Sequence, residues 1–277
     1  MAILNEHYTL HNGVPIPKIG FGTWQIKPGE DAYQAVTKAL KEGYRHIDTA
    51  QDYGNEADVG RAIMDVGIKR DNVFVTSKLE SHIKTYDGAI EAFNRTLDNM
   101  GFTYLDLFLI HAPWPWTQMG KDCSEGNVMA FKAMEHLYHE GKIRAIGVSN
   151  FDVHDVKNIT THCDTVPHVN QIAYFIGMKN DAIHDYCKQH DILVEGYSPL
   201  AIGYLLNNPT VQSMAKTYNV SPAQLCIRYV LERGALPISK SVHQTRIREN
   251  AQIDFSISSR DMDTLKNITG DPRQFDE

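Results

Sequence analysis

Short apolar segments alternate with amphipathic segments along the whole sequence, and this alternation constrains the fold more than any other feature. Eight apolar segments have the length and residue types of strands that are buried on both faces. They cover residues 19–24, 45–50, 73–79, 105–112, 143–151, 168–174, 192–200 and 235–240. Because such strands need helices on both sides, the pattern predicts a parallel sheet of the α/β class.

Helical periodicity fills the intervals between these segments. In residues 31–43, small apolar side chains recur every three or four positions along one stripe, and Gly43 closes the helix. Before the first strand, Asn12-Gly13 separates two short apolar runs. This dipeptide predicts a β-hairpin with a two-residue turn.

Eight strands favour closure into a single (β/α)8 barrel, the TIM barrel, with the hairpin at its bottom and extra helices near the C-terminus. The alternative is an open doubly wound sheet. The sequence lacks the main nucleotide-binding signatures of that fold, because no G-x-G-x-x-G follows the first strand and no G-x-x-x-x-G-K-S/T occurs anywhere. No linker rich in proline or serine divides the chain, so we expect one domain covering residues 1–277.

The formal net charge of −7 argues against binding to nucleic acid or to a membrane, because surfaces that follow phosphates carry a basic excess. No apolar run approaches the roughly 20 residues that span a bilayer, and the N-terminus has no secretion-signal pattern. The four cysteines form no C-x-x-C pair, and the histidines lack the spacing of metal ligands. We expect a cytoplasmic protein without a metal site.

Polar side chains stand at the C-terminal ends of the predicted strands, where such a barrel carries its active site. Asp48 directly follows an apolar strand, and Tyr53 lies on the loop beyond it. The other strand ends carry Trp24, Lys78, His111, Ser149, Asn150, Gln171, Tyr197, Lys240 and Ser241. A barrel that needed only stability would have few polar groups there, so we interpret this ring as a candidate active site.

Three long runs give this candidate a family resemblance. GYRHIDTAQDYGNEADVG (43–60), MEHLYHEGKIRAIGVSNF (134–151) and ISKSVHQTRIRENAQI (238–253) resemble the three signature regions of the aldo-keto reductases, in the family's order. VTSKL around Lys78 and LIHAP around His111 resemble two further family positions. The resemblance spans the chain and is closest to bacterial 2,5-diketo-D-gluconate reductase-like and glyoxal reductase-like members.

The resemblance implies an oxidoreductase of the alcohol dehydrogenase and carbonyl reductase type, which transfers hydride from NADPH to aldehydes and ketones. Its catalytic residues would be Tyr53, Asp48, Lys78 and His111. A free phenol has a pKa of about 10 and is a weak acid near pH 7, so Lys78 is expected to lower the pKa of Tyr53. Asp48 would keep Lys78 charged. His111 would hydrogen-bond the carbonyl oxygen or relay a proton.

The resemblance also implies a binding site for the 2′-phosphate of NADPH at Lys240, Ser241 and Arg246. Positive charge gathers here in an otherwise acidic chain, and arginine suits bidentate phosphate contacts. Ser239 departs from the family pattern, which has proline or a small apolar residue at this position. Lys240 and Ser241 are still present, and we expect Ser239 to affect the loop and with it the choice between NADPH and NADH.

Further cofactor contacts follow from the same resemblance. Ser149, Asn150 and Gln171 would hold the nicotinamide carboxamide, and Tyr197 would stack on the nicotinamide ring. The remaining implied contacts are Thr23 near the ribose, Glu249 and Asn250 at the adenine end, and Ser198, Leu200 and Val242.

The substrate would bind among Trp24, Tyr53, His111 and Trp114. All three tryptophans, with Trp116 as the third, follow the first and fourth strands, which predicts an apolar-walled mouth. Methylglyoxal, simple aldehydes, keto-sugars and keto-esters all fit such a mouth. The insert 113–127 is a candidate lid, and a monomer that acts on a small carbonyl compound is expected.

Other function classes compete with this interpretation. YHEGK (138–142) matches the Y-x-x-x-K motif of another reductase class, but Gly141 sits at a helix end and the glycine-rich loop of that class is missing. A binding or regulatory subunit that holds nucleotide with little turnover is the non-enzyme alternative, and the retained catalytic residues argue against it. Isomerases and hydrolases also use this fold, and the basic cluster in 238–253 disfavours them.

Overall fold

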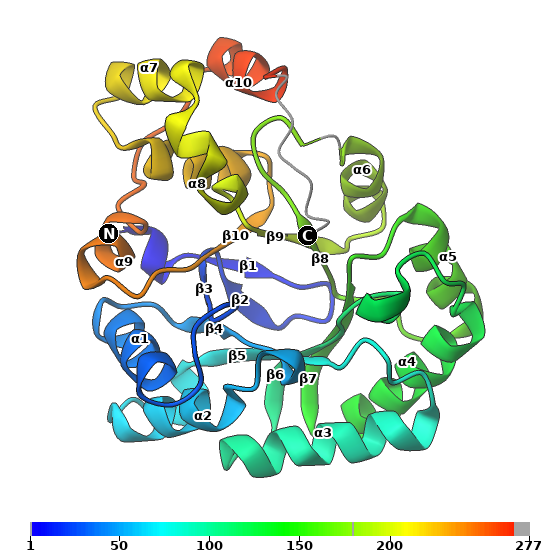
Figure 1. The fold of residues 1–277 in the computed structure, drawn as a ribbon. Coiled ribbons are helices and arrows are strands. Elements are labelled where there is room, and N and C mark those ends of the chain that lie inside the picture. The colour runs from blue at the N-terminus through cyan, green and yellow to red at the C-terminus, as the bar shows by residue number, and fades with distance from the viewer. Residues whose placement is uncertain (1, 179, 269–277) are drawn as a thin grey trace.

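The computed structural model describes residues 2–178 and 180–268. In this part of the chain eight parallel strands close into a barrel, in the order β10-β3-β4-β5-β6-β7-β8-β9 (Figure 1). They are β3 (Gly20–Gly22), β4 (His46–Asp48), β5 (Phe74–Leu79), β6 (Leu105–Ile110), β7 (Ile143–Ser149), β8 (Val169–Ala173), β9 (Leu193–Tyr197) and β10 (Leu236–Ser239). Each strand lies within one of the predicted segments, so the α/β barrel is confirmed.

Helices surround the barrel and cover its outer face (Figure 1). They are α1 (Glu30–Lys41), α2 (Glu56–Asp65), α3 (Tyr86–Met100), α4 (Ser124–His139), α5 (Val153–His162), α6 (Asp181–Gln189), α7 (Pro209–Thr217), α8 (Pro222–Glu232), α9 (Gln244–Glu249) and α10 (Ser259–Lys266). Short 3-10 helices are η1 (Ala2–Asn5), η2 (Gln51–Tyr53), η3 (Arg70–Asn72), η4 (Trp116–Gln118) and η5 (Ala201–Asn207). The extra helices expected toward the C-terminus are present. No helix in the described ranges is long and apolar enough to cross a bilayer.

Helix α1 shows how the sequence pattern becomes structure. Its buried residues are Ala32, Ala35, Val36, Ala39 and Leu40, which form the predicted stripe. Beyond its end, Gly43 adopts a φ of 104° and its backbone N–H donates to the Leu40 carbonyl at 3.1 Å. A glycine accepts this left-handed conformation at low cost, so the chain can turn directly into β4.

The predicted hairpin consists of β1 (His7–Thr9) and β2 (Pro15–Pro17), which pair antiparallel. The prediction of a two-residue turn is wrong. Leu10 N–H donates to the Val14 carbonyl at 2.9 Å and Gly13 N–H donates to the Leu10 carbonyl at 2.8 Å, so three residues form the loop. Of these three, Gly13 alone has a positive φ, 85°, whereas the predicted turn needs positive φ at both central positions.

The hairpin closes the N-terminal end of the barrel (Figure 1). Its Leu10 and Ile16 belong to one buried cluster with residues of the barrel strands, among them Phe74, Val169 and Leu236 from the strands' N-terminal halves. A second, larger cluster packs the outward-facing strand residues against the helices. Because the bottom is sealed in this way, the opposite ends of the strands are left to carry the polar side chains.

Candidate active site

The four predicted catalytic side chains meet at the C-terminal ends of neighbouring strands. Asp48 is the last residue of β4, Lys78 lies near the end of β5, and His111 follows β6 directly. Tyr53 ends η2, the short helix that follows β4. The parallel pairing of β4 with β5 and of β5 with β6 places these strand ends side by side.

Lys78 is the centre of this group. Its side chain is fully buried, and its Nζ donates to Asp48 Oδ1 at 2.7 Å and to Asp48 Oδ2 at 2.8 Å. It also donates to the Thr49 carbonyl at 2.9 Å and lies 3.4 Å from the Tyr53 hydroxyl. Burial acts to lower the pKa of Lys78, but the Asp48 carboxylate and Tyr53 outweigh burial and raise it. The ammonium therefore stays charged inside the barrel.

The Tyr53 phenol has a shifted pKa whose net direction differs from the prediction. Burial raises the pKa of Tyr53 to about 12, although the charge of Lys78 acts to lower it. The expected influence of Lys78 is present, but the cost of burying a phenolate is larger. The predicted net lowering is therefore wrong, and Tyr53 keeps its proton at neutral pH.

His111 lies beside Tyr53, with their ring centroids 5.6 Å apart in an edge-on arrangement. Its Nδ1 is 2.8 Å from Oδ2 of Asp52, a residue that the sequence interpretation did not single out. Burial lowers the pKa of His111, and the hydrogen bond to Asp52 opposes that effect. Asp52 precedes Tyr53 in the chain, so one short helix supplies two neighbours of the imidazole.

The residues predicted at the nicotinamide lie next to this group. Tyr197 donates its hydroxyl to Asn150 Oδ1 at 2.7 Å, and Asn150 Nδ2 donates to the His111 carbonyl at 2.9 Å. Ser149 donates its hydroxyl to the Gln171 carbonyl at 2.8 Å. The structure therefore brings these four predicted residues into one hydrogen-bonded neighbourhood with His111.

Gln171 connects that neighbourhood to a buried carboxyl group that sequence reasoning missed. Its Nε2 donates to Asp48 Oδ2 and to Glu195 Oε2, each at 2.8 Å. Burial, and then the Asp48 charge, raise the pKa of Glu195 to about 8. The sequence signal was an acidic residue inside the apolar strand ILVEGYSPL.

Thr23 and Asn55 brace the loop that carries Tyr53. Thr23 is fully buried and donates its hydroxyl to the Asp48 carbonyl at 3.1 Å. Asn55 was also missed; its Nδ2 donates to the Thr23 and Ile26 carbonyls, each at 3.2 Å, and its Oδ1 accepts from the Thr49 hydroxyl at 2.7 Å. The run HIDTAQDYGNE therefore contains Asp48 and Tyr53 and also Asn55, whose hydrogen bonds hold the loop between them in place.

Two of the three tryptophans, Trp114 and Trp116, lie beside His111. The Trp114 and Trp116 centroids are 5.1 Å apart, and the Trp116 centroid is 5.3 Å from that of His111. Trp116 and Trp24 have exposed fractions of 40% and 42%. Large, partly exposed rings at the rim suit an apolar substrate wall.

The basic cluster near β10 separates into paired and unpaired cations. Arg248 donates to Glu42 through Nε at 2.8 Å and through Nη2 at 3.0 Å, and Arg248 with Gln244 lowers the pKa of Glu42. Lys240 and Arg246 are exposed and form no ion pair within the described residues. These two cations and the Ser241 hydroxyl, which lie within seven positions of one another in the sequence, are donors of the type that binds a phosphate group.

The other predicted cofactor contacts are distributed around this end of the barrel. Ser198 and Leu200 lie between β9 and η5, and Ser198 has a positive φ of 52°. Val242 is 42% exposed, Glu249 is exposed and Asn250 is buried. Ser239 is buried, so this departure from the family pattern faces the interior.

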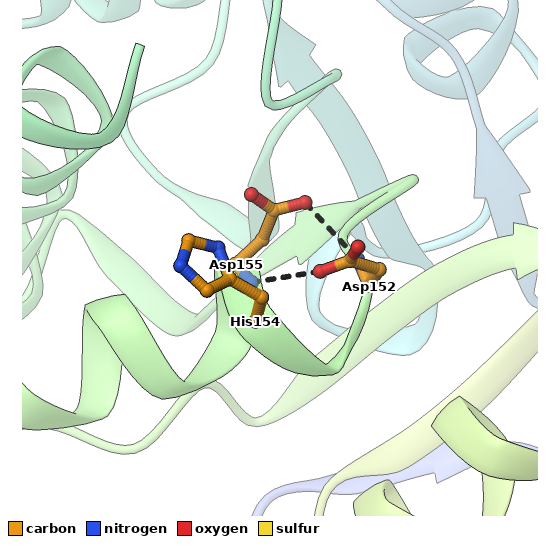
Figure 2. A group of neighbouring side chains, drawn as sticks. All are labelled: Asp152, His154 and Asp155. Atoms are coloured by element: carbon orange, nitrogen blue, oxygen red, sulfur yellow. Dashed lines mark hydrogen bonds between the residues drawn. The ribbon is translucent and has the colours of Figure 1, made fainter. Parts of the chain in front are cut away.

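One cluster of potential metal ligands lies away from this site. Asp152, His154 and Asp155 bring ligand atoms within 4.8 Å of one another at the start of α5 (Figure 2). Asp155 N–H donates to the Asp152 carboxylate at 2.9 Å and Asp152 N–H donates to that of Asp155 at 3.2 Å. This reciprocal pair is a capping box, which accounts for both carboxylates, and we assign them no ligand role.

Comparisons with known proteins place this geometry in a family. Residues 18–269 match the aldo/keto reductase family. The glyoxal reductase of Bacillus subtilis (strain 168) is 40% identical over 271 residues, which cover 98% of this chain and 95% of that protein. The 9,11-endoperoxide prostaglandin H2 reductase of Trypanosoma cruzi (strain CL Brener) is 38% identical over 277 residues, with 96% and 95% covered.

Solved structures are similar over nearly the same extent. An aldo-keto reductase from a Medee basin deep-sea metagenome library superposes with a TM-score of 0.87 at 40% identity and covers 94% of each chain. An aldo-keto reductase of Bombyx mori, solved in complex with NADP, superposes with a TM-score of 0.85 at 29% identity, covering 94% of this chain and 92% of its own.

Proposed function

The chain belongs to the aldo/keto reductase family, and on that premise we propose that it reduces aldehydes and ketones to alcohols with NADPH. Family membership makes it an oxidoreductase and implies a nicotinamide cofactor. The observation that carries the proposal is the buried Lys78 ammonium, which contacts both the Asp48 carboxylate and the Tyr53 hydroxyl. We assign the whole chain, 1–277, to one catalytic domain, of which residues 1, 179 and 269–277 lie outside the described part.

Tyr53 is the proton donor in this proposal. When bound, the reduced nicotinamide supplies the hydride, and negative charge then develops on the substrate's carbonyl oxygen. With its pKa raised to about 12, Tyr53 keeps its proton until an alkoxide, which is a stronger base than phenolate, forms beside it. The Lys78 ammonium, 3.4 Å from the phenol oxygen, then stabilises the phenolate that is left.

Asp48 and His111 support this step in different ways. Asp48 holds the Lys78 ammonium by two short hydrogen bonds and so keeps the charge in place despite burial. His111 borders Tyr53 and contacts the substrate next to the reacting oxygen. Together these groups place an ammonium next to a proton donor at a largely buried barrel end, which favours the transition state over the neutral substrate.

The proposed preference for NADPH over NADH rests on Lys240, which follows β10, and on Arg246 of α9, neither of which forms an ion pair within the described residues. Lys240 and Arg246, with the Ser241 hydroxyl, would hold the 2′-phosphate. At the other end of the cofactor, Asn150 and Gln171 would bind the carboxamide and Tyr197 would stack on the ring. Thr23, Ser149, Ser198, Leu200, Val242, Glu249 and Asn250 complete the proposed contacts.

The proposed substrates are small keto-aldehydes, keto-sugars and keto-esters. Trp24 and Trp114, together with Trp116, offer an apolar wall next to the polar reaction centre, which suits a short carbonyl compound. The relative named glyoxal reductase supports a small dicarbonyl as the first compound to try. We further propose a cytoplasmic monomer, in keeping with four free cysteines.

The test follows the absorbance of NADPH at 340 nm, and of NADH separately, with methylglyoxal and benzaldehyde. We expect turnover with NADPH that is lost in Tyr53→Phe, a variant that keeps the circular dichroism of the parent. Tyr33→Phe is the matched control, because its hydroxyl bonds Asp65 on the outer surface and its loss leaves turnover unchanged. Tight NADPH binding without any turnover would instead favour a binding or regulatory subunit.

A further inference from the structure

The carboxylate of Asp52 faces Nδ1 of the His111 ring, with Oδ2 of Asp52 2.8 Å from that nitrogen. The His111 side chain is 8% exposed and that of Asp52 is 28% exposed. Asp52 forms no ion pair with lysine or arginine in the described residues. The imidazole is therefore the titratable side chain that Asp52 contacts directly.

The protonation of Asp52 determines what it can do for His111. Burial acts to raise the pKa of Asp52, but hydrogen bonds from His111, the Trp116 side chain and the Ser81 backbone outweigh burial and lower it. Asp52 is thus a carboxylate at neutral pH, and a carboxylate only accepts hydrogen bonds. The short contact consequently requires a proton on Nδ1 of His111.

The other ring nitrogen follows from that requirement. Burial first, and the Lys78 charge with it, lower the pKa of His111 in spite of Asp52, so the imidazole carries one proton at neutral pH. That proton is on Nδ1, so Nε2 presents a lone pair. The charged and titratable groups that face the ring are Asp52, Lys78, Asp48 and Tyr53.

An Nε2 lone pair does not hydrogen-bond a carbonyl oxygen, because both are acceptors. It does accept from a hydroxyl group. Tyr53 already supplies a donor to the carbonyl oxygen, so His111 is complementary to a hydroxyl on the neighbouring carbon. We propose that Asp52 is a positioning residue that holds the proton on Nδ1 of His111, which selects carbonyl substrates bearing a hydroxyl beside the carbonyl.

Asp52 and His111 also lie next to Trp116 of the insert 113–127. The Trp116 ring packs edge-on against the His111 ring, with the two centroids 5.3 Å apart, and the Trp116 side chain acts to lower the pKa of Asp52. Asp52 and the imidazole therefore share a neighbour in the insert 113–127. The substrate preference rests on the proposed carbonyl reduction, whereas the position of the His111 proton does not depend on turnover.

The proton is located first, by ¹⁵N chemical shifts of the His111 ring in the full-length protein at pH 7.5. We expect the Nδ1–H form in the parent and a shift toward the Nε2–H form in Asp52→Leu. Asp52→Glu, which keeps a carboxylate, is expected to restore Nδ1–H at least in part. An Nε2–H form in the parent, or an unchanged spectrum in Asp52→Leu, would overturn the proposal.

Substrate choice is then measured with hydroxyacetone and 2-butanone, which have the same number of heavy atoms. The ratio of their kcat/KM values is compared between variants, so the intrinsic reactivity of each ketone cancels. We expect the ratio to fall about tenfold in Asp52→Leu, the effect of one lost hydrogen bond, and to stay unchanged in Asp65→Leu, which removes a remote carboxylate. An unchanged ratio in Asp52→Leu overturns the specificity proposal alone, whereas absence of turnover with every carbonyl compound in the parent overturns the proposed function.

Discussion

Lys78 and Asp48 form a two-pronged ion pair inside the barrel, with Nζ 2.7 Å and 2.8 Å from the two carboxylate oxygens. Both side chains are almost completely buried, so water could not solvate either charge if its partner were removed. The pair therefore combines two functions. It keeps an ammonium next to the Tyr53 phenol, and it ties the end of β4 to the end of β5.

Removing one member of this pair should cost about 3–5 kcal/mol of unfolding free energy, because the other charge stays buried without a partner. The variant is Asp48→Ala, and the measurement is equilibrium unfolding in urea. Arg61→Met breaks the exposed pair with Asp58 and is the control, with an expected change below about 1 kcal/mol. If both variants lost a similar unfolding free energy, the buried pair would contribute no more to stability than the exposed one.

Arg246→Ala and Arg248→Ala are expected to differ in nucleotide binding although both remove an exposed arginine from α9. Arg246 forms no ion pair within residues 2–178 and 180–268, so we expect it to bind the 2′-phosphate, whereas Arg248 is paired with Glu42. Arg246→Ala should weaken NADPH at least tenfold, the effect of losing a charged hydrogen bond, and NADH much less. Calorimetric titration of each variant with both nucleotides gives the answer, and equal weakening of NADPH and NADH by Arg246→Ala contradicts the phosphate role.

Glu195 should make the folded state less stable as the pH rises. Its pKa is raised to about 8 in the folded state from an ordinary value of 4.5, so the folded protein holds a proton that the unfolded chain releases. The stabilisation is complete below the unfolded pKa and is lost as the pH rises toward 8. Unfolding free energies at pH 5 and pH 8.5 should differ less in Glu195→Gln than in the parent or in the exposed control Glu91→Gln. A pH dependence that survives unchanged in Glu195→Gln refutes this assignment.

Lys84 anchors both ends of the insert 113–127, because its Nζ donates to the Ala112 carbonyl and to Asn127 Oδ1, each at 2.7 Å. Lys84→Met should release this anchor and speed cleavage of the insert by thermolysin, mapped by mass spectrometry. Lys132→Met, which removes an exposed lysine, is the control. Cleavage at the parent rate in Lys84→Met would mean that other contacts hold the insert.

The barrel could be predicted from local patterns because each strand and helix is encoded by nearby residues. Segments such as 73–79 carry apolar side chains on both faces, and this property alone requires helices on both sides of the sheet. The hairpin could be predicted for the same reason, but the length of its loop could not. The Asn12 side chain donates to the Arg144 carbonyl at 3.0 Å, a contact from a distant strand that a local pattern does not contain.

The candidate site was predictable where it follows strand ends and unpredictable where it depends on partners distant in the chain. Asp48 and Lys78 could be paired because consecutive parallel strands end side by side. Asp52 and His111 are separated by 59 positions, and neither residue type indicates the other. Likewise, nothing in the basic run 238–253 indicates that Glu42 neutralises Arg248.

The sequence by itself determined the repeating architecture and the polar residues that stand at the open end of the barrel, because periodicity and strand ends are local properties. Tertiary structure alone decided the electrostatics. It set the pKa of Tyr53 by burial against the charge of Lys78, placed the proton of His111 by bringing Asp52 to its ring, and paired Arg248 with Glu42 while leaving Arg246 without an ion pair among the described residues. Desolvation and charge pairing depend on which groups share a small buried volume, and only the closed barrel defines that volume.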